Sequence, residues 1–304
     1  MSAVRDLVDK LVRPLALQIA KIFDLPKFTP HAPVFFISLA AYTLVFLTAP
    51  HFSRLLFPKA YPAVSKRYIY GWKVHMVSMS HALVILPWAL ALVNTSMPAV
   101  ENDKAFGWDE RLGDLQAVSA AYFVWDTIES AVSGAGIDFV LHGLACTIIY
   151  MIGYRPFTAY YGPRALLWEL STPFLNIHWF LDKVGKTGTR LQLANAGFLL
   201  TAFLGARLIY GPYLSYDFLC TMWSVRHEVS PFVTGSFTLG NIVLNCLNYW
   251  WFGKMISAIQ KRFKKSPTAQ EDGSANPAAV SVDGQTLQLP EPEAVEAALH
   301  PREA

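Results

Sequence analysis

Long apolar stretches recur along most of this 304-residue chain, and each is long enough to cross a bilayer as a helix. Windows of about 20 residues predict about seven such spans, at 32–50, 74–93, 115–133, 137–153, 162–181, 192–223 and 232–256. The range 192–223 is too long for one straight span, and we expect it to break at Gly211-Pro212. Depending on that break, the count is six to eight. The pattern predicts an all-α, multi-pass transmembrane helix bundle.

The composition excludes an ordinary soluble protein. Hydrophobic residues make up 53% of the chain and charged residues only 15%, whereas soluble domains have roughly a quarter of charged residues. The net charge is +3, and the basic residues gather in loops. We therefore expect anionic lipid headgroups, and not nucleic acid, as partners. The three cysteines fall in or beside separate apolar stretches, so we expect neither a disulfide framework nor a metal site.

The chain divides into four regions. Residues 1–31 form an N-terminal amphipathic segment that mixes charged residues with Leu and Val, which is typical of a helix lying on a membrane surface. Residues 32–65 hold the first transmembrane helix and a basic loop, and residues 66–258 hold the remaining spans. Residues 259–304 begin with basic residues and continue as a Pro-, Ala-, Ser- and Glu-rich tail that we expect to be disordered.

Lys and Arg concentrate in the loop 51–73, in the loop 182–190 and just after the last span. With seven spans, all three places lie on one side of the membrane. The positive-inside rule makes that side cytosolic, and the C-terminus with it. The N-terminus would then face the opposite side, although it is basic as well.

Polar residues at helical spacing mark one face of several predicted helices, so we expect these faces to meet in a common interior. The members are Ser78 and His81; Tyr122, Asp126, Glu129 and Ser133; Asp138, His142 and Cys146; Glu169, Thr172 and Asn176; and Asn241, Asn245 and Asn248. Pro173 is expected to kink the helix that carries the fourth set.

A purely structural role competes with a functional one for each of these residues. Asparagines in membrane helices mostly form hydrogen bonds between helices. Asp138 lies in the first turn of its helix, where a carboxylate favours the helix dipole. Asp126 and Glu129 share one face, so they must be protonated, paired or hydrated. His142 lies one turn deeper than Asp138, within the apolar run, and is the best single functional candidate.

Four short runs together resemble the TLC domain (TRAM, LAG1 and CLN8 homology): Trp125-Asp-Thr-Ile-Glu129, Asp138-Phe-Val-Leu-His142, Tyr154-Arg-Pro-Phe157 and Glu169-Leu-Ser-Thr-Pro-Phe-Leu-Asn176. The resemblance covers residues 66–258. Within the superfamily the chain looks most like the TMEM56-type TLC domain-containing proteins. The resemblance implies a bundle of membrane helices in the endoplasmic reticulum or a related membrane, enclosing a cavity for lipid chains.

The chain departs from the ceramide synthases of this family. Those enzymes join an acyl group from acyl-CoA to a sphingoid amine and use two adjacent histidines, followed by acidic residues in the next helix. This chain has Leu141-His142 at the first position and Glu169 with Ser171 and Thr172 at the second. Acyltransferase activity therefore cannot simply be carried over.

Two main hypotheses follow. In the first, the protein binds, senses or handles a lipid and contributes to membrane lipid homeostasis, with the headgroup or cavity contacted by Asp126, Glu129, Asp138, His142, Glu169, Thr172 and Asn176. In the second it is an acyltransferase that takes acyl-CoA, with His142 as base or acyl carrier and Glu169 as its partner. A small-solute transporter or a scaffold is a third possibility. None of these readings requires a cofactor.

Overall fold

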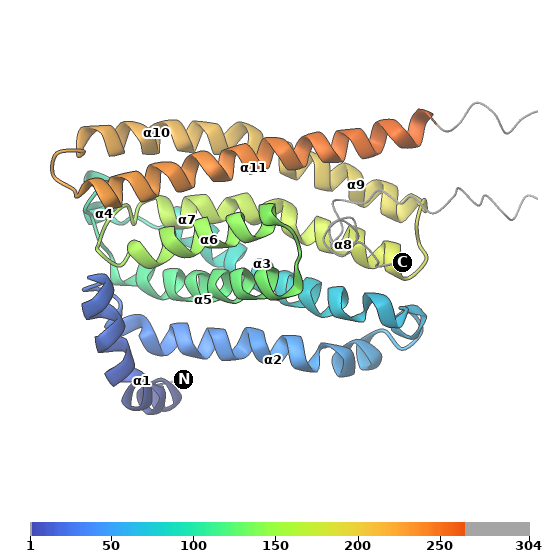
Figure 1. Ribbon diagram of the computed structural model, residues 1–304, viewed down its shortest axis with the longest axis horizontal. Helices are drawn as coiled ribbons and strands as arrows, with labels where there is room; N and C mark the ends of the chain where they lie inside the picture. Colours follow the sequence, from blue (N-terminus) through green and yellow to red (C-terminus); the bar gives the residue numbers. More distant parts are fainter. Residues whose placement is uncertain (1, 265–304) are drawn as a thin grey trace, which may run out of the picture.

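The computed structural model describes residues 2–264, with side chains as far as residue 260, and this part of the chain is α-helical without strands (Figure 1). The tail from Ser266, for which we expect disorder, lies outside the described residues. The helices are α1 (Ser2–Phe23), α2 (Ala32–Leu56), α3 (Ile69–Val93), α4 (Pro98–Asn102), α5 (Glu110–Ser133), α6 (Ile137–Ile152), α7 (Tyr161–Leu166), α8 (Thr172–Lys183), α9 (Arg190–Phe203), α10 (Gly211–Ser224) and α11 (Pro231–Lys264).

Each predicted span corresponds to one helix or to consecutive helical segments of an elongated bundle (Figure 1). In the described part of the chain, three helical stretches are long and apolar enough to cross a membrane by length and composition alone: Thr29–Leu56, Lys66–Val93 and Arg190–Ser224. The expected all-α transmembrane bundle is confirmed. The last helix runs past the predicted end at residue 256, and the basic segment after it begins as further turns of α11.

The predicted break at Gly211-Pro212 is wrong. The chain stays helical from Arg190 to Ser224, and its irregularity is a π-helical stretch, Leu204–Tyr210, between α9 and α10. Proline cannot donate a hydrogen bond to the preceding turn, and a local widening of the helix accommodates that loss without a break. The π stretch carries Arg207, so its widening also sets the position of the one charged side chain within it.

The irregularity expected at Pro173 takes the form of a tight segment just before it. A 3-10 helix, Leu167–Ser171, joins α7 to α8, and Pro173 sits in the first turn of α8. There its missing N–H costs no intrahelical bond. The 3-10 segment carries Glu169 in the interior of the bundle.

The helices α5 and α6 form the most extensive pair, and α11 lies along the other side of α6 (Figure 1). Helix α5 begins at an Asp109 cap, whose side chain accepts from the Arg111 N–H at 2.9 Å. It ends at Gly134, which has a φ of 69° and so adopts the left-handed conformation that favours glycine. These two caps define where α5 begins and ends, and α5 forms one wall of the interior.

Helix α1 lies across the end of the bundle where α2 begins (Figure 1). Arg5 ties it to α5 through Asp114 at 2.9 Å, and Ala16 is fully buried against the bundle. Val12 and Ile19 are half-buried and pack against the core, whereas many other apolar side chains of α1 are exposed, among them Val4, Leu7, Leu11, Ile22 and Phe23. This arrangement suits a helix lying on a membrane surface, which stays a prediction.

Candidate functional site

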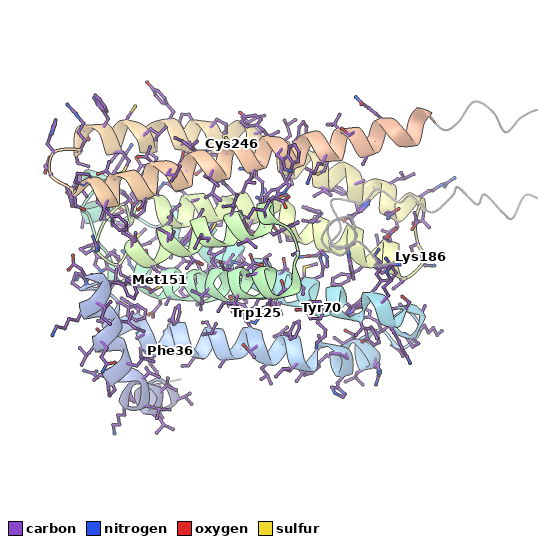
Figure 2. The ribbon with its side chains drawn as sticks, in the orientation of Figure 1. Phe36, Tyr70, Trp125, Met151, Lys186 and Cys246 are labelled. Carbon is purple, nitrogen blue, oxygen red and sulfur yellow. The ribbon has the colours of Figure 1, made fainter. Side chains whose placement is uncertain are left out.

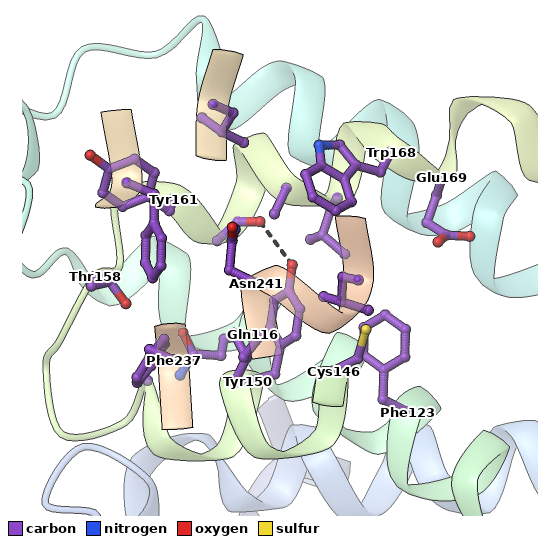
Figure 3. A pocket seen from close by; sticks show the side chains of 18 of the residues that line it. Gln116, Phe123, Cys146, Tyr150, Thr158, Tyr161, Trp168, Glu169, Phe237 and Asn241 are labelled. Atoms are coloured by element: carbon purple, nitrogen blue, oxygen red, sulfur yellow. Dashed lines mark hydrogen bonds between the residues drawn. The ribbon is translucent and has the colours of Figure 1, made fainter. Parts of the chain in front are cut away.

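A narrow, mostly apolar cavity lies between α5, α6, α7, α10 and α11, with a volume of about 90 Å³ (Figure 3). Aliphatic and aromatic side chains form most of its wall, including Phe123, Ile149, Tyr150, Phe157, Phe218 and Phe237. Two charged side chains, Glu169 and Arg207, line it as well. The cavity therefore has a mostly apolar wall with polar groups at one place, as small-molecule binding sites usually do.

The polar group is a buried ion pair. The Arg207 guanidinium donates through Nη2 to Glu169 Oε1 at 3.1 Å, and the Thr172 hydroxyl donates to Glu169 Oε2 at 2.6 Å. The side chains of the pair are only 7% and 10% exposed. A buried charge is tolerated only when it is paired and hydrogen-bonded, and this arrangement provides both conditions.

Further contacts fix the orientation of Arg207. Its Nε donates to the Trp168 carbonyl at 2.9 Å and to Ser171 Oγ at 3.2 Å, and its Nη1 donates to Asn248 Oδ1 at 3.2 Å. The guanidinium thus joins the π stretch, the 3-10 segment and α11. Because three elements meet at this one side chain, the end of the cavity is rigidly organised.

Four residues that line this cavity each have a buried side-chain nitrogen without a hydrogen-bond partner: Gln116 Nε2, His142 Nδ1, Trp168 Nε1 and Asn248 Nδ2. The amide and indole nitrogens are donors in any state, whereas the role of the histidine nitrogen depends on its tautomer. Leaving such a group unpaired costs about 1–3 kcal/mol. A ligand with acceptor oxygens would recover that cost.

The structure brings two of the predicted site residues, His142 and Glu169, to the same cavity. The His142 ring lies 5.3 Å from the Trp251 ring and 6.1 Å from the Phe123 ring, measured between centroids. Cys146, one turn further along α6, also lines the cavity. Figure 3 places Glu169, Trp168, Phe123 and Cys146 at one end and Thr158, Tyr161 and Phe237 at the other.

The other predicted site residues lie outside the cavity wall. Asp138 accepts from Trp251 Nε1 at 2.9 Å and lies 3.5 Å from Lys254 Nζ, so it fastens α6 to α11. Asn176 accepts from His75 Nδ1 at 2.7 Å. Asn176 also donates to Ser78 Oγ at 3.1 Å, so it fastens α8 to α3. Thr172 acts on the cavity through Glu169 alone.

Asp126 and Glu129 are half-buried on α5 and are not among the cavity-lining residues. Asp126 faces α6 near Gly143. His81 is fully buried, hydrogen-bonded through Nδ1 to the Tyr42 hydroxyl at 2.9 Å and stacked on Tyr122 at 3.8 Å. These groups pack helix against helix and do not reach the cavity.

The asparagine stripe of α11 divides between two roles. Asn241 and Asn245 donate to Ser215 Oγ at 3.1 and 2.9 Å, which joins α11 to α10. Asn248 instead accepts from Arg207, and its buried Nδ2 has no partner. Asn241 and Asn248 both line the cavity. The expected interhelical bonding is present at the first two positions, whereas the third belongs to the polar end of the cavity.

Sequence reasoning missed Arg207, Gln116 and Trp168. A signal for Arg207 was available, because it and Asp217 are the two charged residues within the apolar range 192–223. An ionisable residue at that depth marks a functional site by default. Gln116 and Trp168 carry no such signal, since single glutamines and tryptophans are ordinary in membrane helices.

The comparisons with known proteins agree with this architecture. The TLC domain model matches residues 71–257 of the chain. The chain belongs to the TLC domain family. The match begins just inside α3 and ends within α11, so it includes every element that lines the cavity. No solved structure gives a significant match.

Several curated proteins are similar over most of their length. An uncharacterized TLC domain-containing protein of Schizosaccharomyces pombe is 37% identical over 79% of this chain and 82% of its own. Topoisomerase I damage affected protein 4 of Saccharomyces cerevisiae is 29% identical over 77% and 86%. TLC domain-containing protein 4 of Xenopus tropicalis is 28% identical over 64% and 78%. The resemblance to TLC domain-containing proteins is thereby confirmed.

Proposed function

We propose that this TLC-domain membrane protein binds the acyl chain of a lipid in its cavity and contributes in this way to membrane lipid homeostasis. The observation that carries the proposal is the pairing of an apolar wall with unpartnered side-chain nitrogens at the Arg207 end, namely the Trp168 and Asn248 donors and His142 Nδ1. The apolar wall matches an acyl chain in polarity, and the oxygen atoms at the head of that chain would satisfy the donors.

The charge at this end indicates what kind of head group fits. Glu169 neutralises Arg207 directly, so the pair brings no net charge to the cavity. A carboxylate or phosphate taken out of water would find no excess positive charge in the pair to compensate it. An uncharged acceptor, such as an ester or amide carbonyl, gains the hydrogen bonds without that cost. The proposed ligand is therefore an uncharged acyl lipid.

An acyltransferase is the second candidate, and His142 favours it. Its Nδ1 is buried in the cavity wall without a partner, where an imidazole could transfer a proton or an acyl group from acyl-CoA. However, both Glu169 oxygens are already engaged, by Arg207 and by Thr172. Glu169 would have to exchange partners to orient His142. Lipid binding without catalysis requires no such exchange of partners, so we prefer lipid binding as the proposed function.

We place the protein in the endoplasmic reticulum membrane with a cytosolic C-terminus. The family resemblance supports the membrane, and the basic loops at one end of the bundle support the orientation. In this setting the ligand reaches the cavity from the surrounding bilayer.

The test compares two asparagines of the same helix. Asn248→Leu removes an unpaired donor and the acceptor of Arg207 Nη1 from the residues that line the cavity. Asn245→Leu, the matched control on the same helix, removes the bonds to Ser215 and Asn241 and no cavity-lining residue. Lipids that co-purify in mild detergent are identified and counted per protein by native mass spectrometry. We expect Asn248→Leu to lose about fivefold or more of its bound lipid, since one or two hydrogen bonds are lost, and Asn245→Leu to retain it.

Equal lipid loading in the two variants, or none in the unmodified protein, would contradict lipid binding. An acyl chain found covalently attached to His142 would decide for the acyltransferase. Both variants are compared only if they elute as folded, monodisperse protein, which separates lipid loss from unfolding.

A further inference from the structure

The cavity has a second polar position, far from Arg207. Gln116 of α5 lines the cavity, is only 6% exposed, and its Nε2 has no hydrogen-bond partner. Figure 3 shows it on the side of Tyr150 and Phe237, away from Glu169. A buried amide without a partner on an apolar wall is costly to the folded protein. A ligand atom that accepts a hydrogen bond from Gln116 Nε2 would therefore remove this cost.

Gly153 leaves room for the Gln116 amide in the wall of the cavity. A Cβ at this position would lie 2.9 Å from Gln116 Nε2 and 3.1 Å from its Oε1. The backbone of Gly153 has a φ of −55°, which any residue adopts, so its conformation does not require glycine. Space does. Both residues line the cavity, and a side chain at position 153 would displace the Gln116 amide from its present place.

Nearby hydroxyl groups do not serve Gln116, because they have partners of their own. The Tyr150 hydroxyl donates to the Gly162 carbonyl at 2.9 Å, and the Thr158 hydroxyl donates to the Phe157 carbonyl at 2.7 Å. The Tyr161 hydroxyl donates to Asp217 Oδ2 at 2.8 Å. Trp168, whose indole donor is also unpaired, lies on the side of Glu169 and away from Gln116 (Figure 3).

The spacing of the two polar positions follows from α6, which borders both. His142 lies at one position and Gly153, directly after the helix, at the other. At 1.5 Å of rise per residue the separation along the axis is about 16 Å. An extended alkyl chain, with bonds of about 1.5 Å and angles near 111°, advances about 1.25 Å per carbon. The two positions are thus about 13 carbons apart.

We propose that the preferred lipid carries a second oxygen-bearing group, a hydroxyl or a carbonyl, about 13 carbons beyond its head-group carbonyl, and that Gln116 binds this group. The inference rests on the proposed function, since it assumes that the head group lies at the Arg207 end. The cavity would then distinguish oxygenated acyl chains from plain ones, which contact the same apolar wall but leave Gln116 unpaired.

The experiment uses the full-length protein in lipid nanodiscs and two matched probes, the glycerol monoester of tetradecanoic acid and that of 14-hydroxytetradecanoic acid. The two compete at equal concentration, and native mass spectrometry gives the ratio bound. We expect the hydroxylated probe to bind about fivefold more tightly, the value of one neutral hydrogen bond. The 8-hydroxy isomer, whose hydroxyl would lie against the apolar wall, should bind more weakly than the plain ester.

Gln116→Leu should bind the 14-hydroxy and plain probes equally tightly. If that variant does not fold, the comparison of the two probes on the unmodified protein still tests the inference. Equal binding of both probes by the unmodified protein would overturn the inference and leave lipid binding intact. Failure of both probes to bind would overturn the inference together with the proposed function.

Discussion

Arg207 is the residue on which the polar end of the cavity depends. Its guanidinium contacts the 3-10 segment at Glu169, Trp168 and Ser171 and reaches α11 at Asn248. A buried ion pair of this kind adds little net stability compared with apolar residues of similar size, but losing one partner is expensive. Its value here lies in holding donors in fixed positions around a cavity.

This asymmetry gives a prediction for the pair. Glu169→Leu strands a buried guanidinium and should destabilise the protein by about 3–5 kcal/mol. The double variant Glu169→Leu/Arg207→Met should recover much of that loss, because no unpaired charge remains. Thermal unfolding in one detergent, followed by circular dichroism, measures both. Additive losses in the double variant would mean that the two side chains do not interact as a pair.

At the scale of elements, the crossing of α5 and α6 depends on a small residue. Gly143 faces α5 so closely that a Cβ would lie 2.6 Å from Thr127 Oγ1 and 3.1 Å from Thr127 Cα. Glycines allow such close approach of membrane helices. Thr127 and Thr147 reinforce the crossing, with their hydroxyl oxygens 3.2 Å apart. The crossing sets how α6 presents His142 to the cavity.

Gly143→Ala should therefore force the two helices apart and cost about 1–3 kcal/mol, in line with overpacked sites. Gly197→Ala on α9 is the matched control, because its Cβ would meet nothing within 4 Å. There the better helix propensity of alanine should leave stability unchanged or slightly raised. Melting temperatures in detergent measure both variants, and a stable Gly143→Ala protein would show that the crossing is loose.

At the scale of the whole molecule, the two ends of the bundle differ. The α2–α3 loop, the α8–α9 loop with Lys186 and the end of α11 lie together at one end (Figures 1 and 2). Helices α1 and α4 and the α10–α11 connection lie at the other (Figure 1). The two basic loops and the basic segment after the last span thus lie at the same end of the bundle, as the prediction of seven spans requires.

This arrangement predicts which side each end faces. In a variant whose three cysteines are replaced by serine, Lys59→Cys should react with a membrane-impermeant maleimide once the plasma membrane alone is permeabilised. Ser96→Cys, at the opposite end of α3, should react only after all membranes are opened. The gel shift of the labelled protein measures both. The reverse labelling pattern would show that the topology is opposite to the predicted one, with the C-terminus outside the cytosol.

The class of the molecule could be predicted from the amino-acid sequence alone. Apolar runs of bilayer length, few charges and the motifs from Trp125 to Asn176 were enough for an all-α membrane bundle of the TLC family. These properties are local, since the length and composition of a segment decide whether it can satisfy its backbone within a bilayer. His142 and Glu169 could be selected as candidates for the same reason, as polar residues on otherwise apolar helices.

Which polar residues contact one another could be seen only in the folded bundle. Asp138 and Asn176 look like site residues in the sequence, yet they pair with Trp251 and with His75 to fasten helices together. Arg207 comes to Glu169 from 38 residues away, on a π stretch that replaces the expected break. Helical periodicity gives the face on which a residue lies but not the helix that this face will meet. The rotation and crossing of packed helices determine that partner, and they depend on contacts between segments far apart in the chain.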